Sequence, residues 1–125
     1  MIGYRFLLPA EEEMIDASVF YETATSGLGT GFLDEIQRVV NILRDHPDLG
    51  QPVGRGLRRA LLHRFPFSLI YSAEVDAVLI VAVAHQRRRP EYWKKQNLKQ
   101  MNDLSKRKEQ FLATARTGKG RSLRP

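Results

Sequence analysis

One stretch constrains the fold of this chain more than any other: residues 78–84, VLIVAVA, are apolar at every position. A strand with one face in water alternates apolar and polar residues, so an unbroken apolar run indicates a strand covered on both faces. The run is far shorter than the roughly 20 residues that a membrane-spanning helix needs. The sequence therefore predicts a central strand at 78–84 and no membrane segment.

Three earlier segments also have strand character. Residues 67–74, FSLIYSAE, alternate regularly and are joined to the central strand by the short turn VDAV at 75–78. Residues 57–65, LRRALLHRF, alternate less well, and residues 4–8, YRFLL, form a short β-like run. Together these segments predict a small sheet that is mainly antiparallel, because the later strands follow one another through short connections.

Two helices are expected between the first strand and the others. The first spans about 9–25, where Pro9 suits the first helical turn and three glutamates follow near the positive end of the helix dipole. The glycine-rich segment 26–31, SGLGTG, interrupts it. Thr30 is the expected cap of a second helix that ends before Pro47. This helix carries one apolar stripe, formed by Phe32, Ile36, Val39, Val40 and Leu43.

The expected order of elements is therefore β-α-α-β-β-β, with residues 46–56, HPDLGQPVGRG, as a loop. This order predicts an α+β fold in which a helical hairpin packs on one face of the sheet. We assign residues 1–97 to this domain. Residues 98–125 are expected to form a basic C-terminal extension, partly helical and then disordered.

Charge and composition restrict the function. The net charge is +6, but residues 1–50 are acidic and residues 51–125 are basic, so the basic part is expected to attract polyanions or an acidic partner. The chain has no cysteine, which excludes disulfides and thiol chemistry. The first residues lack the pattern of a secretory signal peptide, so we expect a cytoplasmic protein.

The candidate functional residues follow the central strand, in the sequence AHQRRRPEYWKK. His85 is either a general acid or base, or a structural side chain that hydrogen-bonds the following loop. Arg87 and Arg89 have forked guanidinium groups that match phosphate and carboxylate alike. Tyr92 and Trp93 either stack on nucleic-acid bases or anchor a terminal helix. Neither cysteines nor carboxylates accompany the histidine at ligand spacing, so no metal and no cofactor are expected.

This order of elements, the loop RDHPDLGQPV, the hairpin FPFSLIYSAEVDAVLIVAVA and the ending AHQRRRPEYW resemble the RelE/ParE superfamily over about residues 4–96. Its members are toxins of bacterial type II toxin–antitoxin systems. The resemblance implies a cognate antitoxin protein that wraps the toxin, and complexes of higher order. RelE-like members cut messenger RNA on the ribosome without a metal, whereas ParE-like members poison DNA gyrase.

The catalytic pattern of RelE-like toxins is only partly present. By the resemblance, Arg59 stands at one basic position, but Leu61 and Ser68 stand where a lysine and the phosphate-stabilising arginine are expected. Arg87 falls at the position of the stabilising arginine and Trp93 at that of the stacking aromatic. The ending IVAVAHQRRRP resembles the ParE-like branch more closely.

The leading expectation is therefore a growth-inhibiting toxin that poisons DNA gyrase or a related topoisomerase. The residues expected to bind its partner or target are Arg87, Arg89, Tyr92 and Trp93. One alternative is a ribosome-dependent ribonuclease in which Arg59, His85 and Arg87 are catalytic. The other is a basic nucleic-acid-binding domain without toxicity.

Overall fold

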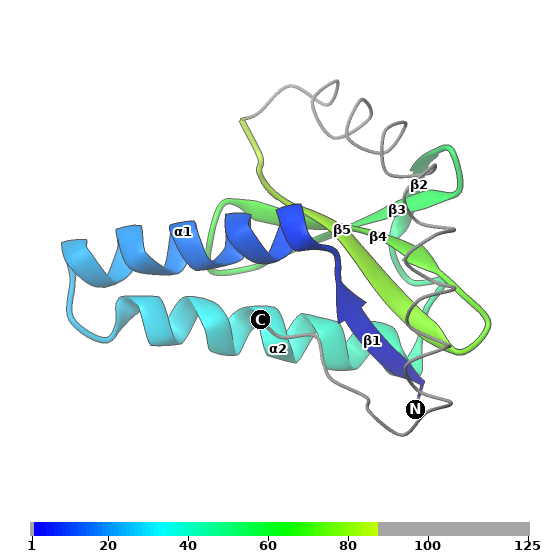
Figure 1. Ribbon diagram of the computed structural model, residues 1–125, viewed down its shortest axis with the longest axis horizontal. Helices are drawn as coiled ribbons and strands as arrows, with labels where there is room; N and C mark the ends of the chain where they lie inside the picture. Colours follow the sequence, from blue (N-terminus) through cyan, green and yellow to red (C-terminus); the bar gives the residue numbers. More distant parts are fainter. Residues whose placement is uncertain (1, 88–125) are drawn as a thin grey trace. The chain divides into compact units, whose positions relative to one another are not determined.

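The computed structural model describes residues 2–87, and the predicted boundary at residue 97 and the extension 98–125 lie outside these residues. The described residues form two helices and a five-stranded sheet. The helices lie beside the sheet (Figure 1). The elements are β1 (Gly3–Phe6), α1 (Leu8–Ala24), α2 (Leu28–Asp45), β2 (Gln51–Gly54), β3 (Leu57–Leu61), β4 (Phe67–Ala73) and β5 (Ala77–His85). Neither described helix has the length and apolar character that crossing a membrane requires.

The strand order in the sheet is β1-β5-β4-β3-β2. β1 pairs with β5 in parallel, and the other neighbours pair antiparallel. This arrangement confirms the predicted α+β fold with a mainly antiparallel sheet. β5 has a strand on each side, and residues 78–84 are all buried, as the apolar run predicts.

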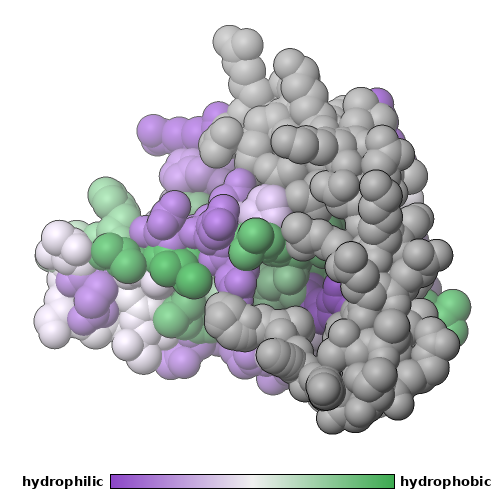
Figure 2. All heavy atoms as spheres, in the orientation of Figure 1, coloured by the Kyte–Doolittle hydropathy of each residue, from purple (hydrophilic) through white to green (hydrophobic). Residues whose placement is uncertain are grey.

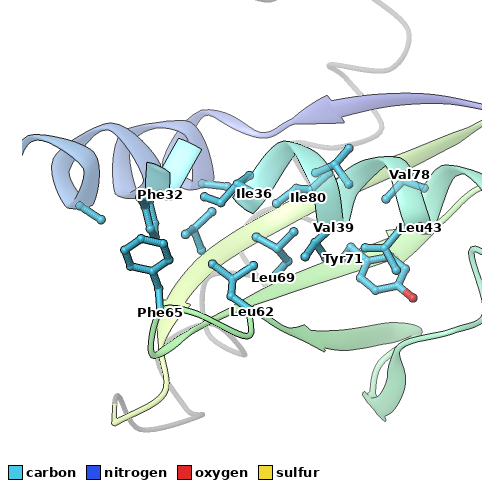
Figure 3. Close-up of a cluster of buried hydrophobic side chains, with 14 residues drawn as sticks. Phe32, Ile36, Val39, Leu43, Leu62, Phe65, Leu69, Tyr71, Val78 and Ile80 are labelled. Atoms are coloured by element: carbon cyan, nitrogen blue, oxygen red, sulfur yellow. The ribbon is translucent and has the colours of Figure 1, made fainter. Parts of the chain in front are cut away.

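The apolar face of α2 and one face of the sheet form the core (Figure 3). All five residues of the predicted stripe are buried: Phe32, Ile36, Val39, Val40 and Leu43. They pack in one cluster with Leu69 and Tyr71 from β4 and with Val78 and Ile80 from β5. The predicted pairing of the helical hairpin with one sheet face is therefore confirmed.

A β-bulge in β5 changes which of its side chains face the helices. Tyr71 on β4 pairs with Ile80, but the preceding residue, Ile70, pairs with Ala82, so that Val81 is an extra residue. The bulge reverses the alternation along β5. As a result Val83, three residues beyond Ile80, also lies in the cluster that faces the helices.

The prediction of an uninterrupted loop at 46–56 is wrong, because β2 lies within it and pairs with β3. Pro52 obscured this strand, but proline is tolerated there because β2 is at the edge of the sheet. The chain turns back into β3 through Gly54, Arg55 and Gly56, which all have positive φ. The predicted strand 57–65 is also too long, since β3 ends at Leu61.

The predicted start of the second helix is wrong as well. α2 begins at Leu28, and its cap is Gly27, with φ 87°, instead of Thr30. Gly29 therefore lies inside the helix, where a β-carbon would collide with the carbonyl oxygen of Ser18 in α1. The carboxylate of Glu22 accepts the backbone N–H groups of Gly27 and Gly29, both at 2.9 Å, and these bonds lower its pKa. Close helix packing and this side-chain cap allow α2 to begin within a glycine-rich segment.

Candidate functional site

The end of β5 is held in place by a network of hydrogen bonds. The backbone N–H of Arg87 donates to Nδ1 of His85 at 3.0 Å. Gln86 donates from its backbone to the carbonyl of Pro66 at 2.8 Å and from its side chain to the carbonyl of Phe67 at 3.1 Å. The β4–β5 hairpin therefore fixes the direction in which the chain leaves the sheet.

These contacts bear on the two roles considered for His85. Because Nδ1 accepts a hydrogen bond from the backbone, the neutral ring carries its proton on Nε2. The ring also packs edge-on against Phe67, with centroids 5.1 Å apart. The geometry fits a side chain that shapes the turn before the arginine cluster, and only Nε2 remains for chemistry.

Arg87 is the one member of the predicted binding set within the described residues, and it is exposed. Arg89, Tyr92 and Trp93 lie outside them. The sheet thus presents Arg87 immediately after a buried, hydrogen-bonded strand end. A cation in this position is available to a phosphate or a carboxylate of a partner.

Arg59 is not brought together with His85. In β3 it pairs with Ile70, so its side chain lies on the face opposite to Leu69. His85 pairs with Phe67, which packs against the helix-facing cluster with Leu69. Strand alternation therefore places Arg59 and His85 on opposite faces of the sheet.

Arg59 has a different neighbour in the structure. Its guanidinium donates to the side-chain oxygen of Gln51 on β2 at 3.3 Å. The two other positions of the RelE-like pattern bring no charge to this face, since Leu61 is exposed and Ser68 is buried. Of these three positions on β3 and β4, only Arg59 therefore carries a cation.

A cavity of about 300 Å³ lies between α2 and β3. Val39, Ile42 and Leu49 contribute apolar walls, and Arg38 and His63 also line it. Sequence reasoning missed this cavity because its lining comes from a helix, a loop and a strand that are far apart along the chain. No single motif could have indicated it.

A buried carboxylate organises one side of the cavity. Glu35 is only 5% exposed, and it accepts two hydrogen bonds from Arg38, at 3.1 and 2.9 Å. It also accepts the backbone N–H of His63 at 2.9 Å. The bonds from Arg38, followed by that from His63, outweigh the effect of burial and lower the pKa of Glu35 from 4.5 to about 2.

Glu35 therefore stays ionised at neutral pH and ties α2 to the segment after β3. Sequence reasoning did not single out this carboxylate. Its position three residues after Phe32 and one before Ile36 puts it on the buried side of that helix, and this was the available signal.

Tyr71 holds the opposite side of the cavity, where the chain passes from α2 to β2. Its hydroxyl donates to the carbonyl of Pro47 at 2.7 Å and accepts the N–H of Gly50 at 2.8 Å. A β-carbon on Gly50 would lie 2.6 Å from that hydroxyl, so this position requires glycine. Arg58 adds hydrogen bonds to the carbonyls of Asp48 and Gly50, at 3.0 and 2.7 Å.

The described residues include no group of three or more histidine, aspartate or glutamate side chains that could hold a metal ion. The chemistry available at the end of β5 and around the cavity is that of arginine, imidazole and apolar side chains. Such surfaces suit recognition of another macromolecule.

Comparison with known proteins gives one similar fold and one matching family profile. No curated protein matches the chain. Among solved structures, a chain of the "Chromosomal ParDE TA system from P. aeruginosa" has a similar fold, with a TM-score of 0.51 and 18% sequence identity. The similarity covers 68% of this chain and 96% of that one.

The profile of a toxin family matches residues 4–90, which is well over half of the chain, and its description is "ParE toxin of type II toxin-antitoxin system, parDE". Apart from Gly3, this match includes every residue of the described helices and strands, and it includes the strand end that presents Arg87. The resemblance to toxins of the RelE/ParE superfamily is thereby confirmed, with an antitoxin as the implied partner. The chain belongs to the ParE toxin family of type II toxin–antitoxin systems.

Proposed function

We propose that this toxin inhibits growth by binding DNA gyrase or a related topoisomerase in the cytoplasm. The observation that carries the proposal is the placement of Arg59 and His85 on opposite faces of the sheet. Metal-free cleavage of RNA requires basic groups that act together on one phosphate. Arg59 is separated from the other two residues of the ribonuclease alternative, His85 and Arg87, and this favours a binding mechanism over ribonuclease activity.

The surface proposed to contact the target begins at the end of β5. Arg87 leaves the sheet from a turn that three hydrogen bonds fix, so little order has to be gained on binding. Arg89, Tyr92 and Trp93, which follow in sequence, complete the proposed surface. A positively charged surface of this kind would also speed the encounter with an acidic partner.

The antitoxin is proposed to occupy the cavity between α2 and β3, alone or within a complex of higher order. Leu49 and Leu61, which line this cavity, are 65% and 54% exposed in the free chain. Covering them would remove apolar area from water. Arg38 lies beside them, and although it bonds Glu35, its side chain stays half-exposed and can also meet a carboxylate of the partner. The cavity therefore suits an apolar side chain that is followed by an acidic one.

Assays with purified toxin distinguish binding to gyrase from cleavage of RNA. We expect it to inhibit supercoiling by gyrase and to trap cleaved DNA, and to leave messenger RNA intact on translating ribosomes. Cleavage of ribosome-bound RNA without an effect on gyrase would establish the ribonuclease alternative. Binding to nucleic acid with a steep salt dependence and neither activity would indicate a plain nucleic-acid-binding domain.

A further inference from the structure

The cavity between α2 and β3 combines an apolar interior with basic side chains at its edge. Val39 and Leu43, which line its interior, are 5% and 0% exposed. Arg38, Arg59 and His63 also line it, and we name these three side chains the basic rim. No aspartate or glutamate lines the cavity within the described part of the chain. The cavity therefore offers apolar surface and hydrogen-bond donors to the same ligand.

The basic rim has donors that the fold does not use. A guanidinium group carries five N–H bonds. Arg38 donates to Glu35 through Nε and Nη2, and its Nη1 forms no hydrogen bond within the described part of the chain. Arg59 forms one bond of 3.3 Å, to Gln51. The imidazole of His63 forms none with the described residues, because the bond from His63 to Glu35 comes from its backbone.

The basic rim also keeps a net positive charge. Glu35 contributes one negative charge, against the two positive charges of Arg38 and Arg59. Asp48 lies 3.9 Å from the guanidinium of Arg58 instead. An anion is therefore the ligand that the charge of the rim favours.

Apolar surface and cations do not coincide in the same way on α1. Val19 and Phe20 of this helix are 58% and 68% exposed, and Figure 2 shows apolar atoms over the helical hairpin, next to hydrophilic ones. The helix contains several carboxylates and no lysine, arginine or histidine. Of these two apolar surfaces, the cavity is the one that suits an apolar anion.

The volume of the cavity limits the size of this ligand. At about 300 Å³ it lies at the lower end of the range of small-molecule sites. An engineered apolar cavity of roughly 150 Å³ binds one benzene ring, so this cavity suits two fused rings. A carboxylate is the expected anionic group, because a guanidinium fork matches its two oxygens and a nearly dianionic phosphate loses more hydration beside apolar walls.

We propose that the cavity between α2 and β3 binds a small apolar carboxylate. Its rings would lie against Val39, Leu43 and Leu49, and its carboxylate would accept hydrogen bonds from Arg38 and Arg59. The site does not depend on which target the toxin inhibits. Because the antitoxin is proposed to use the same cavity, the ligand would compete with it and raise the share of free toxin.

The test begins with calorimetric titration of the full-length toxin with 2-naphthoate. The neutral analogue 2-naphthamide has nearly the same shape and lacks the charge. We expect 2-naphthoate to bind at one site and 2-naphthamide to bind at least fivefold more weakly. Equal affinities would overturn the role of the basic rim, and absence of binding by 2-naphthoate would overturn the site.

A substitution in the basic rim tests the position of the carboxylate. Arg59→Gln is preferable to a change of Arg38, which also holds the buried Glu35. It should weaken 2-naphthoate binding about fivefold and leave 2-naphthamide binding unchanged. The matched control is Arg55→Gln, in the exposed turn before β3, which removes the same charge outside the cavity and should bind like the parent. Equal losses in both variants would show an effect of net charge alone and overturn the site.

A second substitution tests the apolar wall. Leu49→Ala removes apolar contact at a position that is 65% exposed, so the variant should melt as the parent does. It should weaken the binding of both probes severalfold. Val75→Ala, at a fully exposed position between β4 and β5, is the control and should bind both probes normally. Binding of both probes to Leu49→Ala within twofold of the parent would overturn the placement of the rings.

Competition separates this inference from the proposed function. With 2-naphthoate near saturation, the antitoxin encoded beside the gene should bind the toxin severalfold more weakly. Simultaneous binding of both would contradict the placement of the antitoxin in the cavity and leave the ligand site standing. Tight binding of the antitoxin to a toxin that takes up no 2-naphthoate would overturn the inference and leave the toxin assignment intact.

Discussion

The carboxylate of Glu35 in α2 accepts the backbone N–H of His63 at 2.9 Å, across 28 residues of sequence. The same carboxylate holds the guanidinium of Arg38 with two further hydrogen bonds. One buried charge thus joins the second helix to the segment between β3 and β4. The bond fixes the wall of the cavity that we propose for the antitoxin.

Replacing this charge should destabilise the fold. Glu35→Gln leaves a side chain that cannot accept all three hydrogen bonds, and we expect a loss of about 1–3 kcal/mol in the free energy of unfolding. The urea midpoint measures this loss. Asp34→Asn, at the neighbouring exposed position, should shift the midpoint little, and an equal shift in both variants would contradict the role of Glu35.

The pKa of Glu35 also predicts how stability depends on pH. Its pKa is about 2 in the folded chain and near 4.5 without the fold, so its contribution is complete above pH 4.5. The contribution should be lost progressively as the pH falls from 4.5 towards 2. Urea titrations of the parent and of Glu35→Gln should therefore converge over this interval; a constant difference between them would show that another group is responsible.

The hydroxyl of Tyr71 should be equally important for the opposite wall. Tyr71→Phe leaves the carbonyl of Pro47 and the N–H of Gly50 without their partner in a buried location, at a cost of about 1–3 kcal/mol. Tyr4→Phe is the matched control, because its exposed hydroxyl makes a single long bond of 3.4 Å to Gln37. Thermal melting measures the stability of both variants, and Tyr71→Phe should melt at a lower temperature than Tyr4→Phe. Equal melting temperatures would show that the bonds of the Tyr71 hydroxyl are dispensable.

At the end of β5 we predict an effect on toxicity without one on stability. The double change Arg87→Ala with Arg89→Ala should abolish growth inhibition. We expect the melting temperature to stay almost unchanged, because Arg87 is exposed and an exposed charge contributes little to stability. Growth of cells that express each variant, with protein levels measured, provides the test. The control is Arg55→Ala, in the exposed turn before β3. A fully toxic double variant would show that the target binds at a surface other than the end of β5.

The role of His85 can be tested by a substitution that keeps its hydrogen bond with the backbone of Arg87 and removes its capacity as a general acid or base. Asparagine can accept the backbone N–H of Arg87 through its side-chain oxygen but cannot exchange protons near neutral pH. We therefore expect His85→Asn to remain toxic and His85→Ala to be weaker. Equal loss of toxicity in both variants, with the fold intact, would instead indicate general acid or base chemistry.

Patterns that depend on local periodicity predicted much of this fold. The stripe on α2 is buried as expected, and β4 and β5 lie where alternation and the apolar run placed them. The failures arose where distant segments decide the structure. Gly29 is helical because Ser18 of another helix approaches it, and β2 forms despite Pro52 because β3 pairs with it.

The candidate site was less accessible to sequence reasoning. The cluster of residues after β5 was visible as a motif, and the structure describes His85 and Arg87 from it. That Arg59 and His85 lie on opposite faces depends on the register of three strands, which no local pattern contains. The buried role of Glu35 likewise depends on His63, which is distant in the chain.

The pairing of β1 with β5 has a consequence for synthesis of the toxin in the cell. Gly3 pairs with Ala77, so the first strand to leave the ribosome finds its partner only when the last described strand has emerged. Contacts between such distant segments form late in folding. A nascent chain that is stopped before β5 cannot complete the sheet or present Arg87. Interrupted translation would thus yield harmless fragments instead of partly active toxin.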